Sequence, residues 1–235
     1  MGAIVRSGAV ALACALLAMP ARVEAAGGAY AVDDADIGPS GSCQNEAWAS
    51  FATSRDFTAV ESPACVVTIG LPVEFTALFQ RSRTARDWAT LGGVQLKAVP
   101  INTDRIAVSW AFGFGRDTTV HRNIALANFP ITWKFGKTFR IHTNAGYLYD
   151  GRVDIGYATG GVGFDWDFST HIGLMGEIYI QEGKTTAFRT TSEPRTQLGL
   201  RFIPVPTVDI DLIYGQNLTG RGAHWLTLGL TVRSQ

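Results

Sequence analysis

WLTLGLTVR, the stretch Trp225–Arg233 near the C-terminus, alternates large apolar residues with small or polar ones. From Leu226 onward, leucine and valine take one set of alternate positions, while threonine, glycine and arginine take the other. Successive side chains of a β-strand point to opposite faces, so this period of two predicts a strand with one apolar face. The preceding stretch, LGLRFIPVPTVDIDLIY at Leu198–Tyr214, alternates in the same way on both sides of a proline-containing turn. It therefore predicts a hairpin.

The same period of two recurs upstream over most of the chain. It is clear at 106–115, 127–135, 139–147 and 172–181, and less regular at 67–79, 94–101 and 157–166. These segments predict about ten strands of roughly nine to twelve residues, which is the length that a tilted strand needs to cross a bilayer. The predicted fold class is all-β, an antiparallel up-and-down transmembrane β-barrel.

The predicted connections alternate between short and long. Short turns are expected at 102–104, 136–138, 167–170 and 204–207, and longer polar loops at 81–90, 116–123, 150–154, 181–194 and 215–223. In outer-membrane barrels the short turns face the periplasm and the long loops face outward. An even number of strands also places both termini on the side of the short turns.

The composition narrows the class of protein. Of the 235 residues, 46% are hydrophobic and only 17% are charged, and 20 Lys and Arg balance 20 Asp and Glu. Soluble domains carry about 25% charged residues. Without an excess of basic residues, the chain also has no electrostatic footprint for nucleic acid. We therefore expect no nucleic-acid partner.

Alternation alone does not say which face of the strands is inside. In a soluble, lipocalin-like barrel the apolar face points inward and the other face meets water. Here that other face is mainly Gly, Ala, Ser, Thr and Asn, which suits a polar lumen better than a water-facing surface. Aromatic residues gather near the predicted strand ends, as in interfacial girdles; they are Trp88, Trp133, Phe135, Phe139, Trp166, Phe168, Tyr214 and Trp225. We therefore predict a barrel surrounded by outer-membrane lipid.

The N-terminus has the pattern of a secretory signal peptide over residues 1–25. Arg6 supplies a positive charge, residues 8–19 are apolar, and small residues precede a predicted cleavage site after Ala25. The alternative, a membrane anchor, requires a longer apolar run. The pattern predicts export to the bacterial outer membrane.

Two cysteines, Cys43 and Cys65, remain after cleavage. A disulfide is the expected pairing in an oxidising compartment, with two free thiols as the alternative. No Cys/His spacing indicates a metal site. Residues 26–62 lack the strand pattern and are expected to form an N-terminal periplasmic extension, or alternatively a plug in the lumen. The barrel is expected over 63–235.

The alternation at Leu198–Tyr214 and Trp225–Arg233 resembles that of small outer-membrane β-barrel proteins of proteobacteria, which are porin-like or transporter-like. The resemblance covers the chain from about Cys65 onward. It implies a barrel with a signal peptide and a strongly alternating C-terminal hairpin. Such barrels usually end in an aromatic residue, whereas this chain ends in Ser234-Gln235.

Charged residues on the non-apolar face are predicted to line the lumen. They are Glu74, Lys97, Lys134, Arg140, Asp165, Glu177, Arg201, Asp209, Asp211 and Arg233. Both signs occur equally, and buried charges persist only when paired. One interpretation is an ion-pair network that fills a narrow barrel, and the other is such a network beside a narrow pathway. About eight strands leave room only for side chains, and about sixteen give an open channel.

No catalytic residues, metal site or cofactor are predicted, and the chain is not expected to be an enzyme. Outer-membrane proteases use an Asp-x-His arrangement, which is absent, and Asp209 and Asp211 fall at the wrong end of the barrel. His142-Thr143-Asn144 only faintly resembles a lipid A deacylase motif, without a matching serine. The leading functional prediction is a porin-like, narrow, passive pathway for small hydrophilic solutes or ions. The alternatives are a closed structural or adhesion barrel with functional loops and, third, an outer-membrane enzyme.

Overall fold

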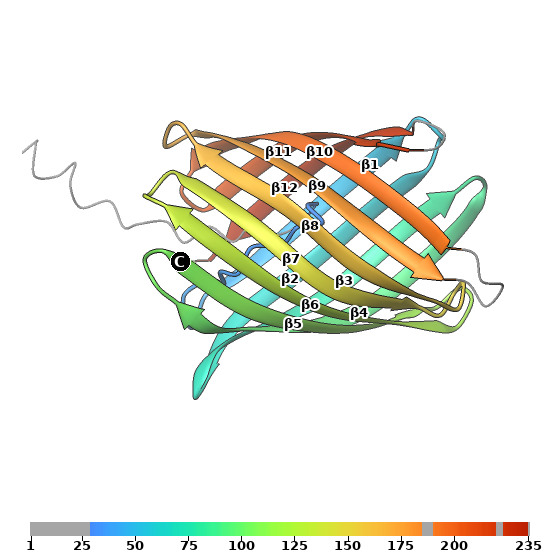
Figure 1. Ribbon diagram of the computed structural model, residues 1–235, viewed down its shortest axis with the longest axis horizontal. Coiled ribbons are helices and arrows are strands. Elements are labelled where there is room, and N and C mark those ends of the chain that lie inside the picture. The colour runs from blue at the N-terminus through green and yellow to red at the C-terminus, as the bar shows by residue number, and fades with distance from the viewer. Residues whose placement is uncertain (1–28, 185–189, 220–222, 235) are drawn as a thin grey trace, which may run out of the picture.

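The computed structural model describes residues 29–184, 190–219 and 223–234. They form a closed barrel in which every strand pairs antiparallel with its neighbours and β1 pairs with β12 (Figure 1). The strands are β1 (Cys43–Ala52), β2 (Phe57–Ile69), β3 (Leu71–Thr84), β4 (Asp87–Asn102), β5 (Ile106–Asp117), β6 (Arg122–Phe135), β7 (Phe139–Asp150), β8 (Ile155–Asp167), β9 (Ile172–Lys184), β10 (Thr190–Val205), β11 (Val208–Asn217) and β12 (His224–Arg233). The predicted antiparallel up-and-down barrel is confirmed. The expected signal peptide, 1–25, lies outside the described residues.

The prediction of about ten strands is wrong, because the barrel has twelve. The segment 67–79, expected as one strand, is divided between β2 and β3 at Gly70, whose φ of 79° allows an abrupt reversal of the chain. The other additional strand is β1, so the barrel begins at Cys43 rather than at the expected residue 63. Two outward positions of β1 hold alanine, whereas the outward positions of the other strands mostly hold large apolar residues. The alternation in hydrophobicity is therefore weak in β1.

The two ends of the barrel differ in their strand ends and loops. One end, here called the terminal rim, carries the start of β1 and the end of β12 (Figure 1). The strands extend into most of the loops expected at the opposite rim; residues 81–90, for example, are the paired ends of β3 and β4.

No helix in the described ranges is long and apolar enough to cross a membrane.

The outer face of the barrel is apolar, whereas the inner face is mainly small or polar, with a few large apolar residues such as Ile203 and Ile213. On β12 the leucines are 44–51% exposed, whereas Thr227 and Thr231 are buried. Aromatic pairs border the apolar belt, with Phe135 against Phe139 at the terminal rim and Phe57 against Trp88 at the opposite rim. A carboxylate also lies on the outer face, at Glu61, which accepts a hydrogen bond from the Asn45 amide.

One aromatic residue of the expected girdles points the other way. Trp225 faces the lumen, where its indole N–H donates to Gln197 Oε1 at 2.8 Å. It pairs with Gly215 across β11 and β12, and a Cβ at position 215 would lie 2.1 Å from the indole ring. The glycine therefore makes room for an inward tryptophan.

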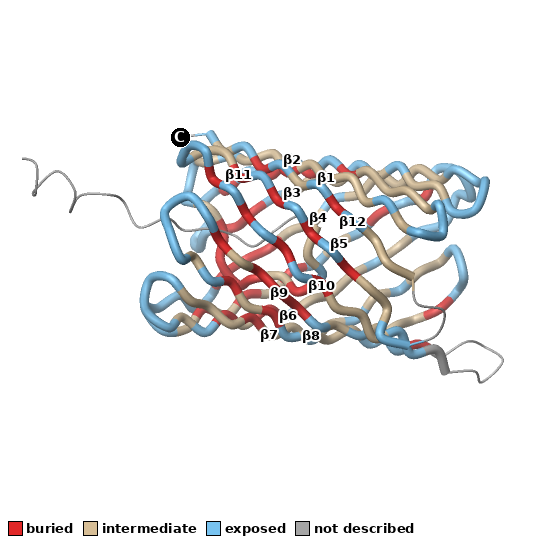
Figure 2. The backbone as a smooth tube through the Cα atoms, turned by 90° about the horizontal axis from the view of Figure 1, so that it is seen from above, coloured by how far each residue is buried: buried red, intermediate tan, exposed pale blue. Residues whose placement is uncertain are grey.

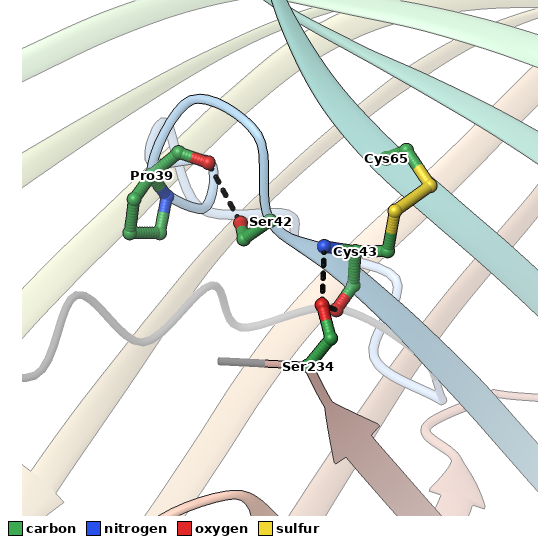
Figure 3. The surroundings of a disulfide bond; sticks show 5 residues. All are labelled: Pro39, Ser42, Cys43, Cys65 and Ser234. Carbon is green, nitrogen blue, oxygen red and sulfur yellow. Dashed lines mark hydrogen bonds between the residues drawn. A yellow bond between two sulfur atoms is a disulfide. The ribbon is translucent and has the colours of Figure 1, made fainter.

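The expected disulfide joins Cys43 and Cys65, which are register partners on β1 and β2. It lies at the terminal rim beside the end of the chain (Figure 3). The Cys43 N–H donates to Ser234 Oγ at 2.9 Å, and the Ser234 N–H donates to the Cys43 carbonyl at 2.8 Å. The first strand is thus held by β2 on one side and by the C-terminus on the other.

The segment before β1 lies inside the barrel (Figure 1). We call residues 29–38 the lumenal segment. Of the expected extension or plug at 26–62, residues 29–38 therefore occupy the lumen, and residues 39–42 form an exposed turn bonded to β2. Residues 43–62 belong to β1, the first turn and β2. Buried residues gather in the half of the barrel nearer the terminal rim (Figure 2), because there the lumenal segment fills the space between the walls.

Candidate functional site in the barrel lumen

The structure places all ten charged residues predicted for the lumen on inward positions of the strands. Seven of them are buried, and Lys134, Arg140 and Arg233 are 14–18% exposed. Except for Glu74, each makes a hydrogen bond or ion pair within the described part of the chain; their partners are other strands and the lumenal segment.

Arg201 is the centre of the cluster on β10, β11 and β12. Its guanidinium donates two hydrogen bonds of 2.8 Å to the Asp211 carboxylate and lies 3.7 Å from Asp209. The Arg233 guanidinium donates a hydrogen bond of 2.7 Å to the Asp209 carboxylate. Bidentate arginine–carboxylate pairs combine charge with fixed geometry. The arrangement links three neighbouring strands at the terminal rim.

A second cluster lies on β6, β7 and β8, and only β9 separates it from the first. The Arg140 guanidinium donates to Asp165 at 2.7 Å, and the Nε2 atom of His142 lies 3.2 Å from the same carboxylate. The other ring nitrogen of His142 is 3.0 Å from Thr132 Oγ1. His142 is thus part of a buried polar network.

The lumenal segment carries the acidic partners that the strand pattern did not reveal. Asp33 and Asp34 lie 2.9 and 3.3 Å from the Lys97 ammonium. Asp36 lies 2.9 Å from the ammonium of Lys134. Three aspartates within four positions were a visible signal in a chain with so few charges, but local periodicity could not show which strands they would meet.

Backbone N–H groups of the lumenal segment also form hydrogen bonds to the barrel wall. The N–H groups of Ala31 and Val32 donate to the Glu177 carboxylate at 3.0 and 2.8 Å. Close approach to β8 requires a glycine, since a Cβ at Gly161 would lie 2.5 Å from Val32. The segment therefore crosses the lumen from β1 to β9, with ion pairs to β4 and β6 on the way.

A cavity of about 440 Å³ lies beside the lumenal segment, with walls from strands around the barrel. Its polar lining includes Tyr30, Asp33, Glu46, Glu74 and Lys97. Burial raises the pKa of the Tyr30 hydroxyl well above its usual range. Burial also raises the pKa of the Asp33 carboxyl, and Lys97 opposes that effect. Glu46 could not be predicted as a lumen residue from the sequence, because the alternation of β1 is weak.

We predict that Glu177→Gln loosens the lumenal segment. The two N–H groups donate to different oxygens of Glu177, so the amide keeps one acceptor, replaces the other with a donor and loses the charge, a loss of about 2 kcal/mol in docking free energy. Hydrogen exchange of the Ala31 and Val32 amides should become faster in the variant. Glu182→Gln, an exposed change on the same strand, serves as the control. Unchanged protection in Glu177→Gln would show that the ion pairs of the aspartates hold the segment alone.

In the described part of the chain, no group of three or more His, Cys, Asp or Glu is arranged to hold a metal ion. The lumen therefore holds paired charges, a cavity with polar and apolar lining, and an internal segment. A protein family described as "Uncharacterised conserved protein UCP029691" matches residues 13–234. The chain belongs to this family. A comparison with curated proteins finds no match.

Solved structures similar to this family member are outer-membrane porins and channels. The NanC porin has a TM-score of 0.65 at 7% identity, over 80% of this chain and 98% of its own. The KdgM porin in complex with disordered oligogalacturonate has a TM-score of 0.62 at 8% identity, with the same coverage. The COG4313 outer membrane channel from Pseudomonas putida F1 has a TM-score of 0.62 at 10% identity, over 86% of this chain and 98% of its own. At these identities the likeness shows a shared fold.

Proposed function

We propose that this protein is an integral outer-membrane β-barrel that gives small hydrophilic solutes or ions a narrow, passive pathway. The signal peptide at 1–25 exports the chain, and the terminal rim faces the periplasm. Outer-membrane lipid surrounds the apolar belt. The chain carries out no catalysis and holds no cofactor.

The observation that carries this proposal is a cavity with charged, polar and apolar lining inside a closed barrel of twelve strands. Twelve lies between the roughly eight strands that side chains fill and the roughly sixteen that leave an open channel. The lumenal segment narrows the lumen further on the periplasmic side. A lumen of this width suits the passage of small solutes and ions. The fold shared with porins also supports a pathway through the barrel.

A closed barrel is the second candidate, and the lumenal segment is the observation that favours it. The segment is held by ion pairs to Lys97 and Lys134 and by the hydrogen bonds of Glu177. A segment held so firmly can close the lumen on the periplasmic side. In that case the loops of the opposite rim would carry the function, as in a structural or adhesion protein.

Planar-bilayer recording of the purified, folded protein distinguishes the two candidates. A narrow pathway predicts small, discrete current steps in KCl. A heat-unfolded sample from the same preparation serves as the control for contaminating channels. Absence of steps from a sample that migrates as a folded barrel on a gel would reject the pathway and support the closed barrel.

A further inference from the structure

The charges around the lumen cavity are not balanced. Among the described residues that line it, the carboxylates are Asp33, Glu46 and Glu74, and the cation is Lys97. Lys97 already has two partners, because its ammonium lies 2.9 Å from Asp33 and 3.3 Å from Asp34. Its positive charge is therefore satisfied by the lumenal segment.

Neither glutamate forms an ion pair among the described residues, although Glu74 is the register partner of Lys97 across β3 and β4. Glu46 and Glu74 are each only 7% exposed. Glu46 accepts a hydrogen bond of 3.3 Å from the Gln44 amide. Across residues 29–184, 190–219 and 223–234, no hydrogen-bond donor or ion-pair partner contacts the Glu74 carboxylate. A carboxylate removed from bulk water requires a counter-charge to stay ionised.

We propose that the lumen cavity binds small cations at Glu46 and Glu74, and that it makes the pathway cation-selective. A ring or pair of carboxylates in a confined lumen attracts cations and repels anions. Trp48 lines the same cavity, and an indole ring can stabilise a nearby cation through its π-system. The selectivity rests on the proposed pathway, whereas cation binding rests on the cavity alone.

Reversal potentials across a KCl gradient test the selectivity. The wild-type protein should pass K⁺ in preference to Cl⁻ by about three-fold or more, from the Coulomb energy of a carboxylate about 7 Å from the ion in a water-like medium. Glu74→Gln removes one cavity carboxylate and should lower that ratio by a similar factor. Glu61→Gln removes one carboxylate from the outer face and should leave the ratio unchanged.

The outcomes separate this inference from the proposed function. Currents that are non-selective or anion-selective would overturn the inference and leave the pathway intact. A folded protein without currents would reject the pathway, and Tb³⁺ added to the protein in detergent then tests the cavity directly. Luminescence excited through tryptophan, and lost in both Trp48→Phe and Glu74→Gln, would support cation binding. Luminescence that persists in Glu74→Gln, or is absent in the wild type, would overturn it.

Discussion

Replacing Arg201 with glutamate is expected to lower the free energy of unfolding by about 3–5 kcal/mol, as breaking a buried ion pair does. Arg201 is 2% exposed and is the guanidinium that faces both Asp209 and Asp211. The substitution places a third carboxylate in a space closed to bulk water. The unfolding temperature of the barrel, read from its heat-modifiable migration on a gel, measures the effect.

Arg105→Glu provides the matched control for charge reversal. Arg105 is exposed in the turn between β4 and β5, so the same change there should cost less than about 0.5 kcal/mol. The unfolding temperature of Arg201→Glu should fall well below that of Arg105→Glu. Equal unfolding temperatures would mean that water screens Arg201, and they would contradict a narrow, ion-paired lumen.

Deleting residues 29–41 is expected to raise the single-channel conductance severalfold. The deletion removes the segment that fills the half of the lumen nearer the terminal rim and leaves the disulfide cysteines in place. It also leaves Lys97 and Lys134 without their aspartate partners, so the barrel should unfold at a lower temperature. Conductance in planar bilayers and heat-modifiable migration measure the two effects separately.

A triple substitution, Asp33→Asn with Asp34→Asn and Asp36→Asn, keeps the volume of the segment and removes its charge. It should produce intermittent channel openings, because the segment is still present but can leave the lumen and return. The deletion should conduct more steadily than the triple variant. An unchanged conductance in a folded deletion variant would show that another part of the lumen limits the current.

The sequence predicts a strand well where large residues point outward and small ones inward. On β12, Leu228 and Leu230 alternate with residues no larger than threonine, and face and register follow directly. On β1, Ala47 and Ala49 face outward. Their small side chains give almost no contrast in hydrophobicity, so the strand could not be recognised locally.

The candidate site could be predicted only in part, because periodicity assigns a face and not a partner. Inward positions such as Arg201 and Glu177 follow from alternation with their apolar neighbours. The contacts of Glu177 with Val32, however, join residues 145 positions apart. Lumenal residues 29–38 have no periodicity of their own, and their position is fixed by ion pairs and by the space above Gly161.

The pairing of β1 with β12 has a consequence for the order of assembly. It joins Cys43 to Ser234 across 191 positions, whereas every other pair of strands is adjacent along the chain. Contacts between distant residues form slowly, because the intervening chain must first be ordered. Lumenal partners on β4, β6 and β9 belong to hairpins that form locally. The first described residues can therefore dock on an open sheet, and the last strand then closes the barrel around them.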